Sequence, residues 1–167
     1  MIKENVQITI ATSDESEQVI DLLKDSARWL HANHIDQWSY LRNGGEDDEI
    51  REAIHNQQTY VLKIDNKIVG TFTLYDKPNE WDTYIWGSLQ DDAIYLHRFA
   101  VIREDKYKGY GAKIIRWIET EWSGLGKKFI RLDCVAGNEK LNKYYQGTGF
   151  KKIGENHDHC MYEKHIL

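Results

Sequence analysis

The stretch of residues 93–122 constrains the fold of this chain more than any other part of it. It begins with a run rich in β-branched and aromatic residues, 94–102, which predicts a strand. A polar segment with glycines at 109 and 111 follows, and apolar residues then recur at helical spacing as far as Trp122. A strand that leads through a glycine-containing turn into a helix leaves unpaired backbone N–H groups at the helix start. This arrangement predicts an anion site of the kind that binds phosphate.

The glycines in the turn follow the pattern Lys-x-x-Gly-x-Gly from Lys106 to Gly111. It is neither a Walker loop, which needs a following Gly-Lys-Ser/Thr, nor the three-glycine dinucleotide fingerprint. The pattern resembles the pyrophosphate loop of the GNAT family of acetyl-CoA-dependent N-acetyltransferases, Arg/Gln-x-x-Gly-x-Gly/Ala. The alternative is a glycine-containing entry to an ordinary amphipathic helix, so the rest of the chain has to decide between the two.

Composition predicts one soluble domain over residues 1–167. The chain has 41% hydrophobic and 29% charged residues and a single proline, which is typical of a globular protein rather than a disordered one. No apolar run reaches the length of a membrane span, and the first residues lack the apolar core of a signal peptide. Two cysteines give no disulfide framework, which favours a cytoplasmic location.

The net charge of −5 is unevenly distributed. Residues 101–152 hold 12 Lys/Arg and 6 Asp/Glu, whereas residues 1–100 hold 9 and 18. A basic half that contains an anion loop and an acidic half suggest two different ligands, a polyphosphate and a cation. The alternative is that the acidic surface only keeps the protein soluble.

The expected strands alternate with helices in a pattern typical of a mixed α/β sheet. Strands are expected at 6–11, 59–64, 67–75, 94–102, 127–135, 150–154 and 161–167, and helices after residues 12, 46, 111 and 137. The long link 76–92 contains Trp81, Tyr84 and Trp86, and a link of that length in a compact domain is usually functional or disordered. Three large aromatic residues argue against disorder.

The expected order of elements, βααβββαβαββ, resembles that of the GNAT, or acyl-CoA N-acyltransferase, fold. The resemblance covers nearly the whole chain. Besides the glycine loop, residues 138–150, NEKLNKYYQGTGF, look like the family's Asn-x-x-Ala-x-x-Leu-Tyr-x-x-x-Gly-Phe. The departures are Lys106 for Arg or Gln, Tyr107 for a frequent Gly, Arg103 for a frequent Pro and Leu141 for a frequent Ala. None removes a glycine or a backbone donor of the loop, so cofactor binding is still expected and its tightness is open.

The resemblance implies acetyl-CoA as the cofactor, with its phosphates on the backbone amides of residues 107–113. It also implies that the main chain at Phe99 and Val101 pairs with the pantetheine arm, and that the Phe99 N–H polarises the thioester carbonyl. Asn138 looks like a second cofactor contact, although a helix N-cap explains an Asn there equally well. The full set of expected contacts is Phe99, Ala100, Val101, Lys106, Tyr107, Lys108, Gly109, Tyr110, Gly111, Ala112, Lys113 and Asn138.

Tyr145 matches the family's general acid, which protonates the leaving thiolate; the alternative is ordinary aromatic packing. The base is less defined. Some members of the family carry a glutamate on the strand that corresponds to residues 94–102, and here that position is Tyr95, which is no base at neutral pH. His97 is a candidate base on the same strand, with Glu80 and Asp82 as alternatives, and a hydrogen-bonded core histidine is the competing interpretation.

The expected acceptor wall combines aromatic and acidic side chains, which suit an ammonium group through charge and cation–π contact. It would be formed by residues 35–38, the acidic cluster 46–49 and the link, with Trp38, Trp81, Asp82 and Trp86 as candidates. The histidines of residues 157–165 lack a second ligand pair at standard spacing, so no metal is expected. The acidic balance argues against nucleic acid as a partner.

Two functions remain open at this point. The first is an N-acetyltransferase that acetylates a small-molecule amine or a peptide amine by direct transfer in a ternary complex. The second is a non-catalytic acyl-CoA-binding or regulatory module on the same fold, because fold does not determine function. Exposed strand edges are compatible with a homodimer, whereas no membrane partner is expected.

Overall fold

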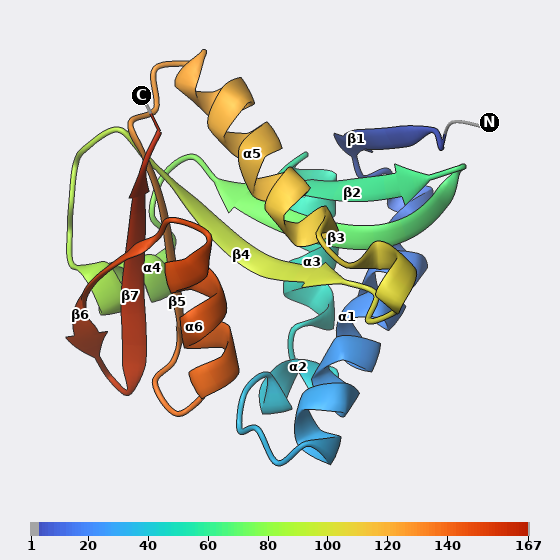
Figure 1. The fold of residues 1–167 in the computed structure, drawn as a ribbon, viewed down its shortest axis with the longest axis horizontal. Coiled ribbons are helices and arrows are strands. Elements are labelled where there is room, and N and C mark those ends of the chain that lie inside the picture. The colour runs from blue at the N-terminus through green and yellow to red at the C-terminus, as the bar shows by residue number, and fades with distance from the viewer. Residues whose placement is uncertain (1–3, 167) are drawn as a thin grey trace. The chain divides into compact units, whose positions relative to one another are not determined.

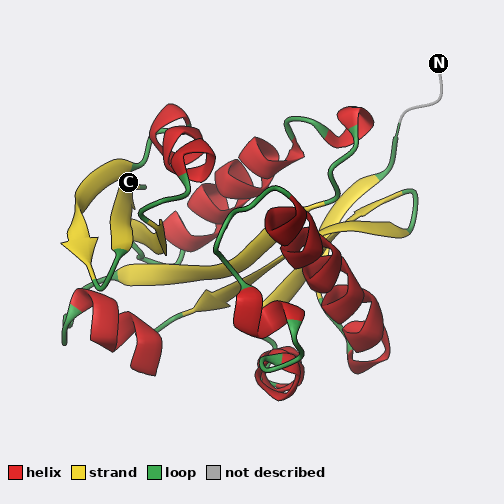
Figure 2. Cartoon of the chain, turned by 90° about the horizontal axis from the view of Figure 1, so that it is seen from below, coloured by secondary structure: helices red, strands yellow, loops and turns green. Residues whose placement is uncertain are grey.

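The computed structural model describes residues 4–166 (Figure 1). The strands are β1 Val6–Ile10, β2 Thr59–Ile64, β3 Lys67–Tyr75, β4 Ala93–Val101, β5 Phe129–Val135, β6 Lys151–Asn156 and β7 His159–His165. The helices are α1 Ser16–Ala32, α2 Ser39–Arg42, α3 Asp47–His55, α4 Glu80–Trp86, α5 Tyr110–Ser123 and α6 Glu139–Gly147. Short 3-10 turns at Ser13–Glu15 and Asp105–Tyr107 precede α1 and α5. Helices and strands joined by short loops make up most of the described chain (Figure 2).

The strands form one seven-stranded sheet in the order β1-β2-β3-β4-β5-β7-β6. The pair β4–β5 is parallel, whereas the pairs β1–β2, β2–β3, β5–β7 and β6–β7 are antiparallel. The predicted mixed α/β fold is therefore confirmed. No helix among residues 4–166 is long and apolar enough to cross a bilayer.

The structure adds two short helices, α2 and α4, to the expected order. Helix α4 lies inside the link 76–92, where the sequence predicted no regular element. Its start is fixed by a reciprocal cap: the Asn79 side chain accepts from the Asp82 N–H at 2.8 Å, and the Asp82 carboxylate accepts from the Asn79 N–H at 3.1 Å. An Asn/Asp pair replaces the usual Ser/Thr and Glu/Gln of a capping box, which is why the pattern was not recognised.

The described chain divides into two compact units. The first comprises residues 4–73 and 98–114, and the second comprises residues 74–97 and 115–166. The chain passes from one unit to the other within β3, β4 and α5, so each transition lies in a regular element.

The first unit has an apolar core between α1, α3 and the strands β2 and β3. Helix α1 turns Val19, Ile20 and Leu23 inward at helical spacing, and α3 contributes Ile50 and Ile54. All five side chains are at most 3% exposed. Burial of this apolar face, more than intrinsic propensity, stabilises both helices.

The second unit has its own core, which α4 covers with Ile85 and Trp86 packed on Ala93 and Tyr95 of β4. On β5, Cys134 lies opposite Cys160 of β7 in the antiparallel register, and both thiols are free. Burial raises the pKa of the Cys134 thiol to about 12, so it stays protonated and unreactive at neutral pH.

Arg131 of β5 is a buried cation that fixes the loop between α4 and β4. Its guanidinium donates to both oxygens of Asp91 at 2.6 Å, to Glu163 of β7 at 2.8 Å and to the Tyr95 hydroxyl at 3.2 Å. A planar guanidinium suits this bidentate pairing. The arginine side chain is 5% exposed, so removing it would leave two carboxylates without their cation.

We predict that Arg131→Met lowers the free energy of unfolding by about 2–3 kcal/mol. This loss is smaller than that from breaking a fully buried ion pair, because the carboxylates can turn toward water. Arg116→Met, at an exposed position of α5, is the matched control and should cost less than about 0.5 kcal/mol. Urea unfolding of both variants measures the difference. Equal losses would show that the Arg131 network contributes nothing specific.

The same network predicts a pH dependence. Hydrogen bonds from Arg131 lower the pKa of the Asp91 carboxyl. A lowered folded-state pKa gives stability that is present above the unfolded value of about 4 and is lost as the pH falls below it. The difference in Tm between wild type and Arg131→Met should therefore narrow between pH 5 and pH 3, and a constant difference would contradict this assignment.

Candidate functional site

The entry to α5 leaves a row of main-chain donors. The N–H groups of Tyr107 and Lys108 bond within the preceding 3-10 turn, at 2.9 and 3.1 Å, and the first helical bond runs from the Lys113 N–H to the Gly109 carbonyl at 3.3 Å. Among residues 4–166, these bonds leave the N–H groups of residues 109–112 without a backbone acceptor. Four donors at the positive end of a helix dipole form an anion site.

Gly109 gives this turn room for a ligand. Its φ of 91° lies in the left-handed region, and a Cβ placed on it would meet no atom within 4 Å. The main chain therefore borders open space in a conformation that glycine adopts without strain. These features fit the diphosphate of coenzyme A, which needs close approach to unpaired N–H groups.

The side chains of this loop divide into cations at the surface and aromatic rings beneath. Lys106 and Lys113 lie over the rings of Tyr107 and Tyr110 at 5.1 and 4.5 Å. Both tyrosines are buried, and the Tyr110 hydroxyl donates to Glu4 at 2.7 Å. The rings thus hold the loop, while the ammonium groups add positive charge around the donors. Of the other expected contacts here, Lys108 is exposed and Gly111 and Ala112 are half-buried.

Strand β4 is bent by one residue in an unusual conformation. Arg98 has a φ of 48°, in the left-handed region that a side chain disfavours. Its guanidinium donates to Glu46 at 3.1 Å and to Glu49 at 2.6 Å, both from the start of α3. Asp47 also pairs with Lys24 at 2.9 Å. Three carboxylates of the acidic cluster 46–49 therefore form ion pairs within the first unit.

Beyond Arg98, main-chain groups alternate between the two edges of β4. The Ile102 N–H donates to Val69 of β3 at 2.8 Å, and the Ala100 carbonyl lies beside Gly70 of β3. Successive residues of a strand point their main-chain groups to opposite edges. Phe99 and Val101 therefore direct their N–H and C=O groups away from β3, as pairing with an extended ligand would require.

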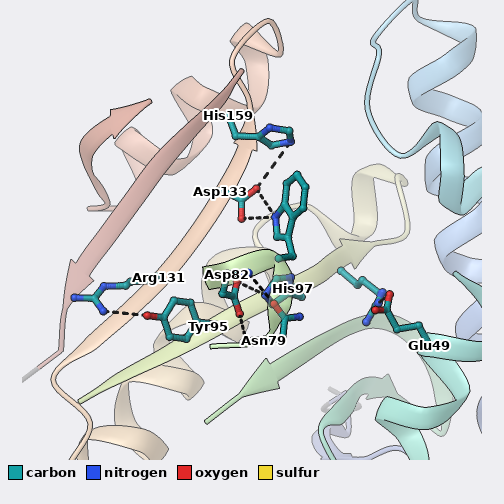
Figure 3. Close-up of polar contacts among 10 residues, drawn as sticks. Glu49, Asn79, Asp82, Tyr95, His97, Arg131, Asp133 and His159 are labelled. Atoms are coloured by element: carbon teal, nitrogen blue, oxygen red, sulfur yellow. Dashed lines mark hydrogen bonds and ion pairs between the residues drawn. The ribbon is translucent and has the colours of Figure 1, made fainter. Parts of the chain in front are cut away.

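His97 and Asp82 form a hydrogen-bonded pair in the second unit (Figure 3). His97 Nε2 lies 2.8 Å from Asp82 Oδ1, and Asp82 is 1% exposed. The same carboxylate accepts from the Asn79 N–H, so the cap of α4 holds it in place. A carboxylate accepts only, which assigns the proton of the neutral ring to Nε2. Nδ1 then carries the free lone pair, and among residues 4–166 it has no hydrogen bond.

A second carboxylate, Asp133 of β5, lies in the same unit (Figure 3). The Trp81 indole N–H donates to both of its oxygens at 3.1 Å, and His159 Nε2 lies 4.0 Å away. Burial raises the pKa of the Asp133 carboxyl, and the nearby His97 opposes that shift. Sequence reasoning missed this residue. The available signal was an acidic residue two positions after Arg131 on a strand whose other face is apolar.

Tyr145 of α6 is enclosed by other rings. Phe150 and Tyr162 lie 5.6 and 5.9 Å from it, centroid to centroid, and the side chain is 6% exposed. Within residues 4–166 its hydroxyl makes no hydrogen bond. Burial raises the pKa of Tyr145, so the phenol keeps its proton at neutral pH. Its neighbour Tyr144 is 37% exposed and projects differently from the helix.

The remaining candidates have mainly structural surroundings. Asn138 is the N-cap of α6, and its side chain accepts from the Leu141 N–H at 3.2 Å. Trp86 lies in the core cluster of the second unit, and Trp38 packs against the core of the first. Within the second unit, the structure thus brings Trp81, Asp82 and His97 together with Asp133, whereas Trp86 packs in the core. No group of His, Cys, Asp and Glu suited to a metal ion is present in the described part of the chain.

Comparison with known proteins agrees with these features. The model of the acetyltransferase (GNAT) family matches residues 18–150. The chain is 34% identical over 158 residues to the uncharacterized N-acetyltransferase YesJ of Bacillus subtilis, covering 93% of this chain and 88% of that protein. A GNAT-family acetyltransferase from Listeria monocytogenes shares the fold with a TM-score of 0.83 and 29% identity, covering 96% of this chain and 95% of the other.

A more distant structure, the PaiA N-acetyltransferase from Thermoplasma acidophilum in complex with coenzyme A, has a TM-score of 0.76 at 17% identity. It covers 96% of this chain and 99% of that one and supports the fold assignment. The family match extends over most of the chain and includes the glycine loop, the His97 strand and the Tyr145 helix. The chain therefore belongs to the GNAT family and is an acetyl-CoA-dependent acyltransferase.

Proposed function

We propose that this chain is a single-domain N-acetyltransferase that transfers an acetyl group directly to a primary amine, cationic at neutral pH, within a ternary complex. The observation that carries the proposal is the His97–Asp82 pair, with Nε2 fixed at 2.8 Å and Nδ1 free among residues 4–166. A primary amine has a pKa of about 10, so a base must remove a proton before it can attack. A histidine with one nitrogen fixed and the other free suits that task.

Acetyl-CoA supplies the activated acetyl thioester when it is bound. The N–H groups of residues 109–112 would hold its diphosphate, with Lys106 and Lys113 as nearby cations. The main chain of Phe99 and Val101 would pair with the pantetheine arm, and the Phe99 N–H would donate to the thioester oxygen. Asn138 is the N-cap of α6, and a contact of this residue with the cofactor is part of the proposal.

The proposed proton transfers use His97 as the base and Tyr145 as the acid. His97 Nδ1 takes a proton from the acceptor ammonium, and the neutral amine nitrogen then forms a bond to the acetyl carbon. The carbon–sulfur bond breaks, and Tyr145 gives its phenolic proton to the leaving sulfur. The second proton that the acetylated nitrogen loses then returns the Tyr145 phenolate to its neutral form. Asp82 acts as a positioning residue, because it fixes the ring tautomer and stabilises the imidazolium.

The second candidate is a non-catalytic acyl-CoA-binding module. The observation in its favour is Tyr95, which takes the place of a strand glutamate, is 1% exposed and hydrogen-bonds Arg131. His97 lies two residues further along β4 and offers the missing base.

We extend the proposal to a cytoplasmic location, because two free, buried cysteines require no oxidising compartment. Homodimerisation stays a prediction from the sequence.

Release of coenzyme A thiol from acetyl-CoA across a panel of alkylamines, polyamines, aminoglycosides and peptide amines tests the proposed function. We expect turnover with at least one cationic amine, with the acetylated product identified by mass spectrometry. Tight acetyl-CoA binding with no turnover on any acceptor would favour the binding module. A neutral or acidic acceptor that outcompetes every cationic amine would contradict the proposed acceptor class.

Gly109→Val should abolish acetyl-CoA binding, because the branched side chain occupies the space beside the N–H groups. For wild type we expect a Kd on the order of micromolar. Gly126→Val is the matched control, since Gly126 also has a positive φ of 88° and open space around its Cβ position. Both variants should lose about 1–2 kcal/mol of stability from backbone strain. Calorimetric titration should show cofactor binding only for wild type and the control; retained binding in Gly109→Val would refute the loop assignment.

Tyr145→Phe keeps the packing of the ring and deletes only the proton donor. We expect kcat to fall by roughly 100-fold or more, while affinity for acetyl-CoA changes only a few-fold. Tyr144→Phe is the control and should leave kcat nearly unchanged. Steady-state kinetics separate the outcomes. A large fall in kcat for Tyr144→Phe would show that the assignment of Tyr145 as the acid is wrong. Full activity in both variants would indicate a thiolate that leaves without protonation.

His97→Gln retains a side-chain N–H that can donate to Asp82 but carries no basic nitrogen. We expect kcat/KM for the amine to fall roughly 100-fold near pH 7.5, with unchanged affinity for acetyl-CoA. The defect should shrink toward pH 10, because more of the amine is then neutral without a base. His55→Gln, at an exposed position of α3, is the control. A pH-independent defect would point to a structural role for His97.

A further inference from the structure

Asp133 is a buried anion that lacks a full cationic partner. Its side chain is 9% exposed, and its contacts among residues 4–166 are one indole N–H shared by both oxygens and a histidine nitrogen at 4.0 Å. A carboxylate offers about four acceptor positions, so about half of them are unused. A buried charge in this state is costly unless a cation pairs with it.

The contrast with Arg131, two residues earlier on β5, shows that the strand does satisfy buried charge elsewhere. Arg131 has two carboxylates within 2.8 Å. No lysine or arginine reaches Asp133 in the described part of the chain, although the neighbouring strands β4 and β7 each carry one. The unused capacity of Asp133 therefore points to a cation that the chain does not supply itself.

Aromatic surface lies directly beside this carboxylate. Trp81 donates to Asp133 and is 39% exposed, and Tyr84, one turn further along α4, is 51% exposed. The two rings lie 5.6 Å apart, and Tyr84 stacks on His157 at 3.8 Å. Exposed aromatic faces next to an anion suit an ammonium group on an apolar stem.

We infer that Asp133 is the specificity-determining residue for the acceptor, and that it pairs with the primary ammonium of an alkylamine whose aliphatic stem lies on Trp81 and Tyr84. This inference rests on the proposed function, since it names the acceptor class of that reaction. It also involves His97 of the same unit, which opposes the rise in the pKa of Asp133. The ammonium binds as a cation at Asp133, and His97 Nδ1 then takes one of its protons.

Binding of n-butylammonium and of its neutral isostere n-butanol tests the inference without any turnover. The probe is the Trp81 indole N–H resonance of the full chain, assigned by its absence from Trp81→Phe. We expect n-butylammonium to shift this resonance with at least tenfold tighter binding than n-butanol. Equal binding of the two compounds by wild type would overturn the inference, whatever the variants do.

Asp133→Asn removes the charge and keeps an oxygen for the Trp81 N–H. We expect it to weaken n-butylammonium binding at least tenfold, to leave n-butanol binding within twofold, and to raise KM for alkylamines far more than KM for acetyl-CoA. Asp158→Asn is the matched control, because this exposed turn residue has a φ of 61° that Asn tolerates. It changes the net charge equally and should leave binding unchanged.

The outcomes separate the inference from the proposed function. If no amine is acetylated but n-butylammonium binding depends on Asp133, the proposed function fails and the cation site stands. If alkylamines are acetylated and Asp133→Asn leaves their KM unchanged, the enzyme assignment stands and the inference is wrong. A thermal unfolding scan of each variant checks that the fold is retained. Equal losses of n-butylammonium binding in Asp133→Asn and Asp158→Asn would also overturn the inference.

Discussion

The left-handed conformation of Arg98 is the constraint on which the geometry of β4 depends. A non-glycine residue at a φ of 48° costs about 1–3 kcal/mol and persists only where its surroundings fix it. Two carboxylates at the start of α3, Glu46 and Glu49, supply that fixation by binding a guanidinium that is 9% exposed. The bend interrupts the regular alternation of β4 directly between His97 and Phe99. The proposed base and the proposed thioester donor therefore lie on one strand, on either side of Arg98.

Buried charge is used in two ways on β5. Arg131 is fully paired, and its network joins the loop before β4 to β7 within the second unit. Asp133 is incompletely paired, so its desolvation is not offset by a protein cation. Groups kept in such a state are concentrated at functional sites, because a ligand can complete the pairing. The same strand thus carries a structural ion network and, two residues later, a carboxylate suited to recognition.

Regular elements with a strong period were predicted well from the sequence. The bounds of β2 and β3 agree residue for residue, because their β-branched runs are bounded by a clear turn. Helix α4 was missed, since its cap uses Asn79 and Asp82. The ion pairs of the acidic cluster 46–49 could not be predicted from the sequence either, because Glu46 pairs with a residue 52 positions away. Long-range pairing of this kind leaves no local pattern, and the same limit hid Asp133.

The aromatic surface of α4 has an evolutionary consequence. Trp81 and Tyr84 lie on a seven-residue helix, where Trp81 contacts His159 at the start of β7 and Tyr84 contacts His157 of the preceding turn. Ile85 and Trp86 of the same helix face the core. Substitution of the outward pair changes exposed surface and leaves the packed face of the helix intact. If Trp81 and Tyr84 bind the acceptor as we infer, acceptor preference can diverge among related chains through a few positions that carry little of the folding energy. Selection on substrate and selection on stability then act on different sides of one short helix.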